Sequence, residues 1–284
     1  DTMVPVTSIH VDSNSQFRKE LFGHVLHVAR YSRHELDTLL EGINAKGYGL
    51  TFGVHTRIDE MSLHCVKAIN AGNVYINRNI IGATVGVQPF GGWGLSGTGP
   101  KAGGPLYLNS LLASPGSRTL PVWAQQQSPW PRQTELTGPT GERNLYQLQP
   151  RGRVLCMFET LAGFGSMADA IEQTGNHAVV LGESARRYLS PISEQPKGIE
   201  VLPDHQSIET ADIDAILFEG DADRLLRVLQ AVRLRPGAMV PVMSLRTEQI
   251  KAGESWPTYR VVQEKSICIN TAAAGGNASL MMLA

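Results

Sequence analysis

The sequence has few cysteines, and they lie far apart. Cys65, Cys156 and Cys268 are odd in number and widely spaced, which argues against a disulfide framework and against a metal site built from clustered thiols. A reducing, cytoplasmic environment is the simplest interpretation. None of the three lies in a motif that lowers the pKa of a thiol, so we predict buried structural cysteines rather than nucleophiles, and no metal site.

Charge and long apolar runs are also scarce. Charged residues make up 18% of the 284 residues and the formal net charge is −1, so no basic excess is present to hold a nucleic acid against this segment. No apolar run approaches the roughly 18 residues that a membrane helix needs, and no signal peptide is visible. The chain begins with Asp1 rather than Met, and we interpret it as a piece of a longer cytoplasmic protein.

Strand and helix signals alternate in both halves of the chain, which is long enough for about two domains. The first half has strand patterns at residues 25–31, 50–55 and 73–77, with helices expected from Ser32 to Gly47 and over 58–71. The second half has strand patterns at residues 153–158, 178–181, 215–218, 239–243 and 266–270, with helices expected over 166–173 and 221–233. This alternation predicts an α/β fold with largely parallel sheets.

A shift in composition separates the two halves. From residue 114 to about 150 the chain is rich in Pro, Gly, Gln, Ser and Thr, which is typical of a linker. We therefore predict one domain over residues 1–113, a linker over 114–150 and a second domain over 151–284.

A long glycine-rich segment, residues 78–105, has almost no periodicity. A loop of this length inside a compact domain is usually functional or disordered, and its apolar residues argue against disorder. Small residues leave backbone N–H groups uncovered, and successive uncovered N–H groups form an anion-binding concavity. Glycine also permits the positive φ angles that such a concavity requires. The alternative, a cluster of purely structural turns, stays open on glycine content alone.

The same segment carries a sequence resemblance. Residues 73–104, with Pro-Phe-Gly-Gly at 89–92 followed by Ser-Gly at 96–97, resemble the carboxy-terminal part of aldehyde dehydrogenase catalytic domains. The longer match over residues 82–105 resembles the glutamate-semialdehyde (1-pyrroline-5-carboxylate) dehydrogenase module of the bifunctional proline utilization enzymes of bacteria. Three further stretches agree with that subfamily, at residues 47–60, 151–156 and 270–281.

The resemblance implies roles for five residues. Gly82 and Ala83 match the aldehyde-anchor loop, whose amides hold the α-carboxylate of the substrate, and Phe90 matches an aromatic residue that lines the aldehyde pocket. Glu20 and Phe22 match a Glu-x-Phe-Gly motif that binds the nicotinamide ribose and packs near the nicotinamide of NAD. This chain has His where Pro usually follows that motif. From the residues alone, Phe90 could equally be a core side chain and Glu20 a solvated charge.

The implied activity is NAD-dependent oxidation of L-glutamate γ-semialdehyde to L-glutamate, with an FAD-dependent proline dehydrogenase elsewhere in the full protein. Such oxidation needs a nucleophilic Cys and a general-base Glu, which precede the Glu-x-Phe-Gly motif in this family. We therefore expect both upstream of this chain, no catalytic residue within it, and no turnover by the fragment alone. The expected partners are the small-molecule substrate, the upstream dehydrogenase domain and further copies in a homo-oligomer.

The second half resembles a degenerate aldehyde dehydrogenase cofactor domain. Residues 174–181 resemble its Gly-Asn-x-Val-Val strand, but Gly182 stands where a Lys contacts the cofactor, and Ala273 stands where the family has the general-base Glu. We expect a non-catalytic, Rossmann-like domain that covers the tunnel of the bifunctional enzyme. Gly163 and Gly165 also fit a weak dinucleotide fingerprint with Glu183, but the preceding strand ends too early for it.

A second hypothesis comes from a different class of protein. The chain could be a truncated, non-catalytic structural or interaction protein derived from an aldehyde dehydrogenase. Coding sequence for a Cys-bearing dehydrogenase domain directly upstream would favour the enzyme, whereas a start codon near Asp1 would favour the alternative.

Overall fold

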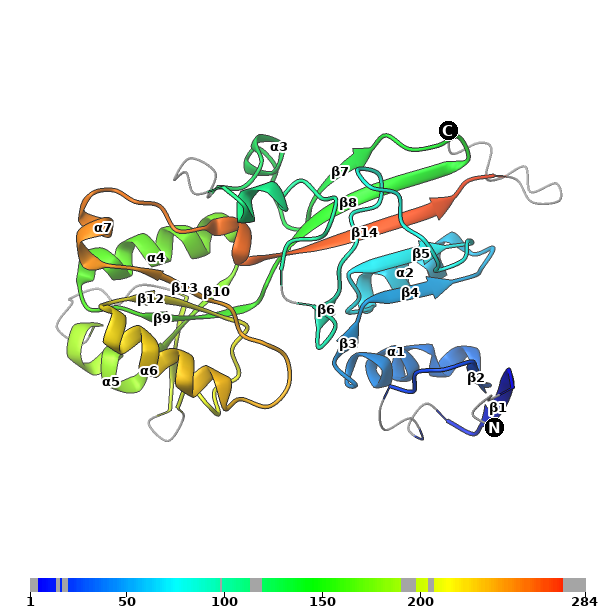
Figure 1. Ribbon diagram of the computed structural model, residues 1–284, viewed down its shortest axis with the longest axis horizontal. Coiled ribbons are helices and arrows are strands. Elements are labelled where there is room, and N and C mark those ends of the chain that lie inside the picture. Colours follow the sequence, from blue (N-terminus) through cyan, green and yellow to red (C-terminus); the bar gives the residue numbers. More distant parts are fainter. Residues whose placement is uncertain are drawn as a thin grey trace.

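The computed structural model describes residues 5–13, 16, 20–97, 99–112, 119–189, 198–203 and 207–272. These residues form an α/β structure with two five-stranded sheets and two small two-stranded sheets (Figure 1). Within the described ranges, no helix has the length and apolar character needed to cross a membrane. The predicted fold class is confirmed.

The amino-terminal elements follow the sequence patterns closely. Strand β1 (Thr7–Val11) pairs in parallel with β2 (Val25–Ala29). The Ser32 amide then donates to the Glu35 carboxylate at 2.7 Å and completes a capping box before helix α1 (Leu36–Asn44). That box places the start of the helix where its side chains and backbone can satisfy the first free amides.

The first five-stranded sheet combines both ends of the chain, in the order β4-β5-β14-β8-β7. Strand β14 runs parallel to β5 and antiparallel to β8. Helix α2 connects β4 to β5, and its Cys65 and Val66 pack with Val74 and Ile267 in the core. The elements are β4 (Thr51–Val54), α2 (Asp59–Ala68), β5 (Asn73–Ile76), β7 (Arg132–Leu136), β8 (Glu142–Pro150) and β14 (Val262–Asn270).

This pairing differs from the linker predicted over residues 114–150. Residues 132–136 and 142–150 form the hairpin β7–β8, and Asn144, Tyr146 and Leu148 of β8 are buried at every second position. That spacing is the period of a strand with one buried face. Polar glutamines between the buried positions gave the segment its linker-like composition. The carboxy-terminal strand β14 likewise belongs to the first sheet rather than to the second unit.

The second five-stranded sheet is entirely parallel, in the order β11-β10-β9-β12-β13. Counted along the chain this is 3-2-1-4-5, the order of a Rossmann-like sheet. Helices α4 and α7 pack on one face through Phe164 and Ile250, and α6 packs on the other through Val228. The elements are β9 (Arg153–Met157), α4 (Leu161–Thr174), β10 (His177–Leu181), α5 (Gly182–Ser184), β11 (Ile199–Leu202), β12 (Ala215–Glu219), α6 (Ala222–Arg233), β13 (Val242–Leu245) and α7 (Thr247–Lys251).

The two long strands β8 and β14 connect the sheets. β8 leads directly into β9 through Arg151 and Gly152, and β14 returns from the second unit to the first (Figure 1). The Rossmann-like unit is therefore covalently and structurally tied to the sheet from which the glycine-rich segment leaves.

Candidate functional site

The glycine-rich segment begins where β5 ends. Loops that follow the carboxyl ends of parallel strands are the usual place for binding sites in α/β proteins. After the segment, residues Leu108–Ser110 form a short 3₁₀ turn. Two residues of the segment, Trp93 and Gly94, form strand β6, which pairs with β3 (Tyr48–Gly49).

The backbone on both sides of Phe90 is fixed by one buried side chain. Asn73 of β5 donates to the Pro89 carbonyl at 3.1 Å and accepts from the Gly91 amide at 3.1 Å. Phe90 itself is half-buried, and its backbone pairs with Ala102. The position of Phe90 is thus set by hydrogen bonds to its neighbours.

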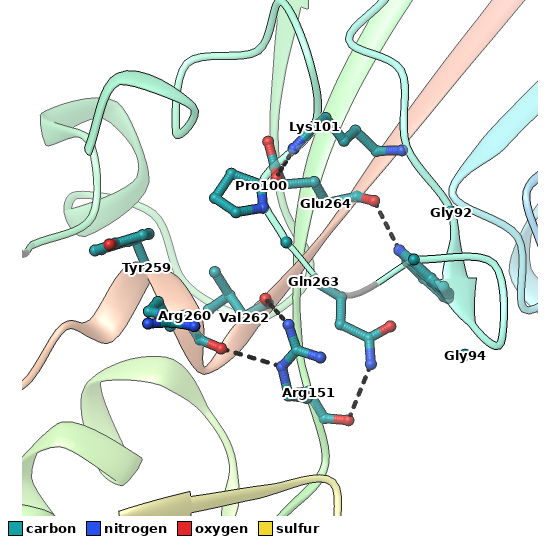
Figure 2. A pocket seen from close by; sticks show the side chains of 13 residues that line it. Gly92, Gly94, Pro100, Lys101, Arg151, Tyr259, Arg260, Val262, Gln263 and Glu264 are labelled. Carbon is teal, nitrogen blue, oxygen red and sulfur yellow. Dashed lines mark hydrogen bonds between the residues drawn. The ribbon is translucent and has the colours of Figure 1, made fainter. Parts of the chain in front are cut away.

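A buried charged group holds the second part of the segment against β14. Lys101 and Glu264 are 2% and 6% exposed, and the Lys101 amide donates to the Glu264 carboxylate at 2.7 Å. Tyr146 donates to the other carboxylate oxygen. The Trp93 indole donates to the Glu264 carbonyl at 2.8 Å (Figure 2). Burial lowers the pKa of Lys101 to about 7 and raises the pKa of the Glu264 carboxyl. The Lys101 ammonium also donates to Asn73.

The same group borders a small pocket between the glycine-rich segment and the base of β14 (Figure 2). Arg151 lines it and donates to the carbonyls of Arg260 and Val262 at 3.1 and 3.4 Å. Burial lowers the pKa of Arg151 to about 10. Because the Arg151 guanidinium is bonded to backbone carbonyls, we assign this pocket a structural role at the junction of the two units.

Lys265 supplies a pH-dependent contribution to stability. Its ammonium donates to the carbonyls of Val66 and Ile69 at 2.9 Å, at the end of α2, and burial lowers its pKa to about 8. An unfolded chain holds this proton to about pH 10.4, so the folded state binds fewer protons between pH 8 and 10.4. Stability therefore rises with pH in that window.

We expect the difference in unfolding free energy between the wild-type chain and Lys265→Met to shift in favour of wild type as the pH is raised from 8 to 10.4. The shift is at most about 3 kcal/mol, from roughly 2.4 pH units at about 1.4 kcal/mol each. Urea unfolding of both chains at pH 7, 8, 9 and 10 measures it. Parallel pH dependences of the two chains would contradict the assignment.

The predicted anchor residues lie on an exposed bend of the glycine-rich segment. Gly82 has φ +82°, a conformation that favours glycine, and both Gly82 and Ala83 are exposed. Their amides donate to no acceptor within the described ranges of the chain. The flanking amides are bonded, because Ile81 donates to Asn79 and Thr84 donates to Gln88, each at 3.2 Å. Two consecutive free N–H groups can bind an anion such as a carboxylate.

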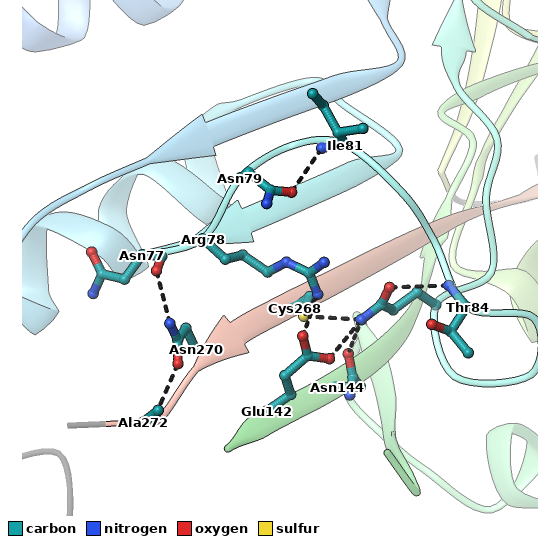
Figure 3. Close-up of polar contacts among 11 residues, drawn as sticks. Asn77, Arg78, Asn79, Ile81, Thr84, Glu142, Asn144, Cys268, Asn270 and Ala272 are labelled. Atoms are coloured by element: carbon teal, nitrogen blue, oxygen red, sulfur yellow. Dashed lines mark hydrogen bonds and ion pairs between the residues drawn. The ribbon is translucent and has the colours of Figure 1, made fainter. Parts of the chain in front are cut away.

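A buried polar cluster underlies this bend (Figure 3). The Gln88 carboxamide is 4% exposed, and its nitrogen lies 2.8 Å from Glu142, 3.1 Å from Asn144 and 3.2 Å from the Cys268 sulfur. Arg78 donates to the second Glu142 oxygen at 2.6 Å and to the Cys268 sulfur at 2.9 Å. Sequence reasoning missed this cluster, because its members come from three segments that only the sheet brings together.

The two residues predicted to contact NAD are accessible. Glu20 is exposed and Phe22 is 97% exposed. In the ranges that the structure describes, the Glu20 carboxylate has no hydrogen bond or ion pair, and no bond joins this segment to the bend at Gly82. An exposed carboxylate suits ribose hydroxyls, and an exposed aromatic ring suits a flat heterocycle.

The weak dinucleotide fingerprint does not form a binding loop. Gly163 and Gly165 lie inside α4. The N-terminus of α4, where a Rossmann-like domain receives a phosphate, is filled by the fully buried Glu219 carboxylate. Glu219 accepts from the amides of Glu159 and Thr160 and from the hydroxyls of Thr160 and Thr247, at 2.8–3.0 Å. This end of the unit does not fit a dinucleotide.

The three cysteines are buried and unpaired, as predicted. Burial raises the pKa of Cys156 to about 12 and also raises the pKa values of the Cys65 and Cys268 thiols. A thiol in that state is a poor nucleophile at neutral pH. Gly182 begins α5 directly after β10, while Ala273 lies outside the described residues.

Comparison with known proteins shows what this site is similar to. Residues 3–114, which carry the glycine-rich segment, match the model of the aldehyde dehydrogenase family. The whole chain is similar to the bifunctional protein PutA. It is 42% identical to PutA of Rhizobium meliloti and 40% identical to PutA of Escherichia coli K12, in each case over 99% of this chain.

The chain spans about a quarter of the length of these relatives, 25% and 24%. A 1-pyrroline-5-carboxylate dehydrogenase of Bacillus subtilis is 39% identical over 37% of this chain and 20% of its own length. The solved PutA of Corynebacterium freiburgense aligns with 90% of this chain and 26% of its own at a TM-score of 0.61 and 22% identity. That likeness confirms the fold.

Proposed function

We propose that this chain is part of an NAD-dependent L-glutamate γ-semialdehyde dehydrogenase within a bifunctional proline-catabolic enzyme, and that it holds the substrate by its α-carboxylate. The observation that carries the proposal is the pair of adjacent amides at Gly82 and Ala83, which lie on an exposed bend and have no acceptor among the described residues. Sequence similarity to PutA and to 1-pyrroline-5-carboxylate dehydrogenase supports the choice of substrate.

The chemistry of the substrate explains why such an anchor is useful. Glutamate semialdehyde has a carboxylate at one end and the reacting aldehyde at the other. Two amide donors that bind the carboxylate restrict the position of the aldehyde carbon, and so lower the entropic cost of reaching the nucleophile. Phe90, whose backbone is held by Asn73, would line the pocket for the carbon chain between the two ends.

The cofactor would be held in part by this chain. Glu20 would accept hydrogen bonds from the nicotinamide ribose hydroxyls, and Phe22 would pack near the nicotinamide ring. When bound, NAD accepts a hydride from the substrate carbon. The nucleophilic cysteine and the general base belong to the upstream dehydrogenase domain, and FAD to a separate proline dehydrogenase domain of the full protein.

The Rossmann-like unit would act without chemistry of its own. The Glu219 carboxylate at the N-terminus of α4 supports this role, because it would repel a phosphate there. We propose that the unit covers the passage between the two active sites, in a cytoplasmic homo-oligomer. The alternative is a free-standing interaction protein derived from an aldehyde dehydrogenase. Such a protein would not need the amides of Gly82 and Ala83 to bind an anion.

Replacement of Ala83 tests the anchor. In the full-length protein, Ala83→Leu is expected to raise the KM for the semialdehyde by about tenfold or more, because the side chain crowds the carboxylate and costs the order of one hydrogen bond. The KM for NAD should change less than about twofold. Initial rates of NADH formation measure both constants.

Ala45→Leu, at an exposed position after α1, is the matched control and should change neither constant. Equal increases of the two KM values in Ala83→Leu would count against an anchor role.

A further inference from the structure

The bend at Gly82 is fixed by Glu142 of β8, a residue that is distant from the bend in the sequence. Two residues bracket the bend, Arg78 before it and Gln88 after it. Arg78 donates to one oxygen of the Glu142 carboxylate at 2.6 Å, and Gln88 donates to the other at 2.8 Å (Figure 3). A single carboxylate therefore ties together both ends of the loop over residues 79–87.

The Gln88 carboxamide is held in one orientation. Its oxygen accepts from the Thr84 amide, and the Gln88 amide donates to the Thr84 carbonyl at 2.8 Å. A side-chain amide can be turned by 180°, which exchanges its oxygen and nitrogen. In the turned state the oxygen would face the acceptors Glu142 and Asn144, and the NH₂ group would face the Thr84 N–H. Asn144 does not decide between the two states, because its own carboxamide can turn and donate. The Glu142 carboxylate can only accept, and it therefore excludes the turned state.

The orientation of Gln88 determines which amides of the bend have an internal acceptor. The Ile81 N–H is taken up by Asn79 and the Thr84 N–H by Gln88. The amides of Gly82 and Ala83 lie between these two and have no acceptor among the described residues. The cluster is largely shielded from water: Gln88 and Asn144 are 4% and 2% exposed, and the side chains of Arg78 and Glu142 are 17% and 23% exposed. Charge-assisted hydrogen bonds in such surroundings are stronger than those at a surface.

We propose that Glu142 is a positioning residue for the aldehyde anchor: through Gln88 and Arg78 it holds the amides of Gly82 and Ala83 in the orientation that accepts the substrate carboxylate. The proposal rests on the function proposed above. It gives the hairpin β7–β8 a role in substrate specificity, because it would favour aldehydes that carry a carboxylate over those that do not.

The test uses Glu142→Gln in the full-length protein. A glutamine in this place cannot accept from both Arg78 and Gln88, so one end of the loop is released. We expect the KM for glutamate semialdehyde to rise about tenfold, the order of one charge-assisted hydrogen bond. The kcat/KM for propanal, an aldehyde of similar reactivity without a carboxylate, should stay within about twofold of wild type.

Hydrogen exchange measured by mass spectrometry gives a second readout that does not depend on activity. Exchange should become faster in peptides covering residues 79–87 and stay unchanged in those covering β5 and β14. The matched control is Glu135→Gln on the neighbouring strand β7, where Glu135 pairs with Arg143 at 3.1 Å and both side chains are about half exposed. It should alter neither KM nor exchange.

Two results would overturn the proposal: an unchanged semialdehyde KM with unchanged exchange over 79–87, or equal losses toward both aldehydes with faster exchange throughout the sheet. If Glu142→Gln fails to fold, Gln88→Met is measured in the same way and carries the same expectations. Failure of the proposed function is distinguishable, since the wild-type protein would then oxidise no semialdehyde, and hydrogen exchange alone would decide whether Glu142 holds the loop.

Discussion

Assayed by itself, the 284-residue chain is expected to form no NADH from L-glutamate γ-semialdehyde above the blank. The reaction needs an accessible thiolate, and each cysteine of the chain is buried. Cys65 packs in the core of the first sheet, Cys156 lies in β9 with its pKa raised to about 12, and Cys268 faces Arg78 and Gln88. The rate of NADH formation is measured by absorbance at a high concentration of the chain and is compared with the rate of a blank that contains no protein.

The full-length protein provides the control. There, Cys65→Ala and Cys156→Ala are expected to keep kcat within about twofold, because neither thiol takes part in covalent chemistry. A measurable rate from the isolated chain, or complete loss of kcat in a folded cysteine variant, would show that the nucleophile lies within these residues after all.

Replacement of Glu219 is expected to cause the largest loss of stability. Glu219→Ala leaves two backbone amides and two hydroxyls, at the starts of α4 and α7, without their acceptor. A buried donor that is left without its acceptor costs about 1–3 kcal/mol, so we expect a total loss of about 3–5 kcal/mol over these groups. The unfolding free energy of the chain, from urea titrations followed by circular dichroism, should fall by that amount.

Glu200→Ala is the matched control in the same sheet. Glu200 forms a two-pronged ion pair with Arg153 at 2.7 and 2.9 Å, but its side chain is 48% exposed. A surface ion pair contributes at most about 1 kcal/mol. Similar losses in the two variants would mean that the Glu219 carboxylate does not hold the helix terminus.

The substitution Gly163→Ala would disturb the same Glu219 contact from the side of helix α4. A Cβ at Gly163 would lie 1.9 Å from a Glu219 oxygen, so glycine is required here for space. The dinucleotide-like spacing of Gly163 and Gly165 therefore has a structural cause. This glycine admits the protein's own carboxylate to the helix N-terminus, in the place where a Rossmann-like domain admits a phosphate.

Most strands could be predicted from the sequence, but the first half of β14 could not. Short-range patterns located β2, β5, β9, β10 and β12, because these patterns depend on neighbouring residues. The pattern of β14 was seen only over 266–270, although the strand spans Val262–Asn270. Glu264 and Lys265 hid its first half, since two adjacent charges indicate a solvated segment unless partners such as Lys101, Tyr146 and the end of α2 are known.

By itself, the sequence determined the α/β class through local periodicity, and the absence of any activating motif indicated that the cysteines are buried. The Rossmann-like second half and the anchor loop at Gly82 were implied by the resemblance to aldehyde dehydrogenases. Only the tertiary structure decided that β5 pairs with β14, nearly 200 residues away, and that Glu142 meets Arg78 and Gln88. It also decided which carboxylate occupies the start of α4. The physical reason is the same throughout: the free energy of a buried charge depends on the partners that packing brings to it, and those partners are far away in the chain.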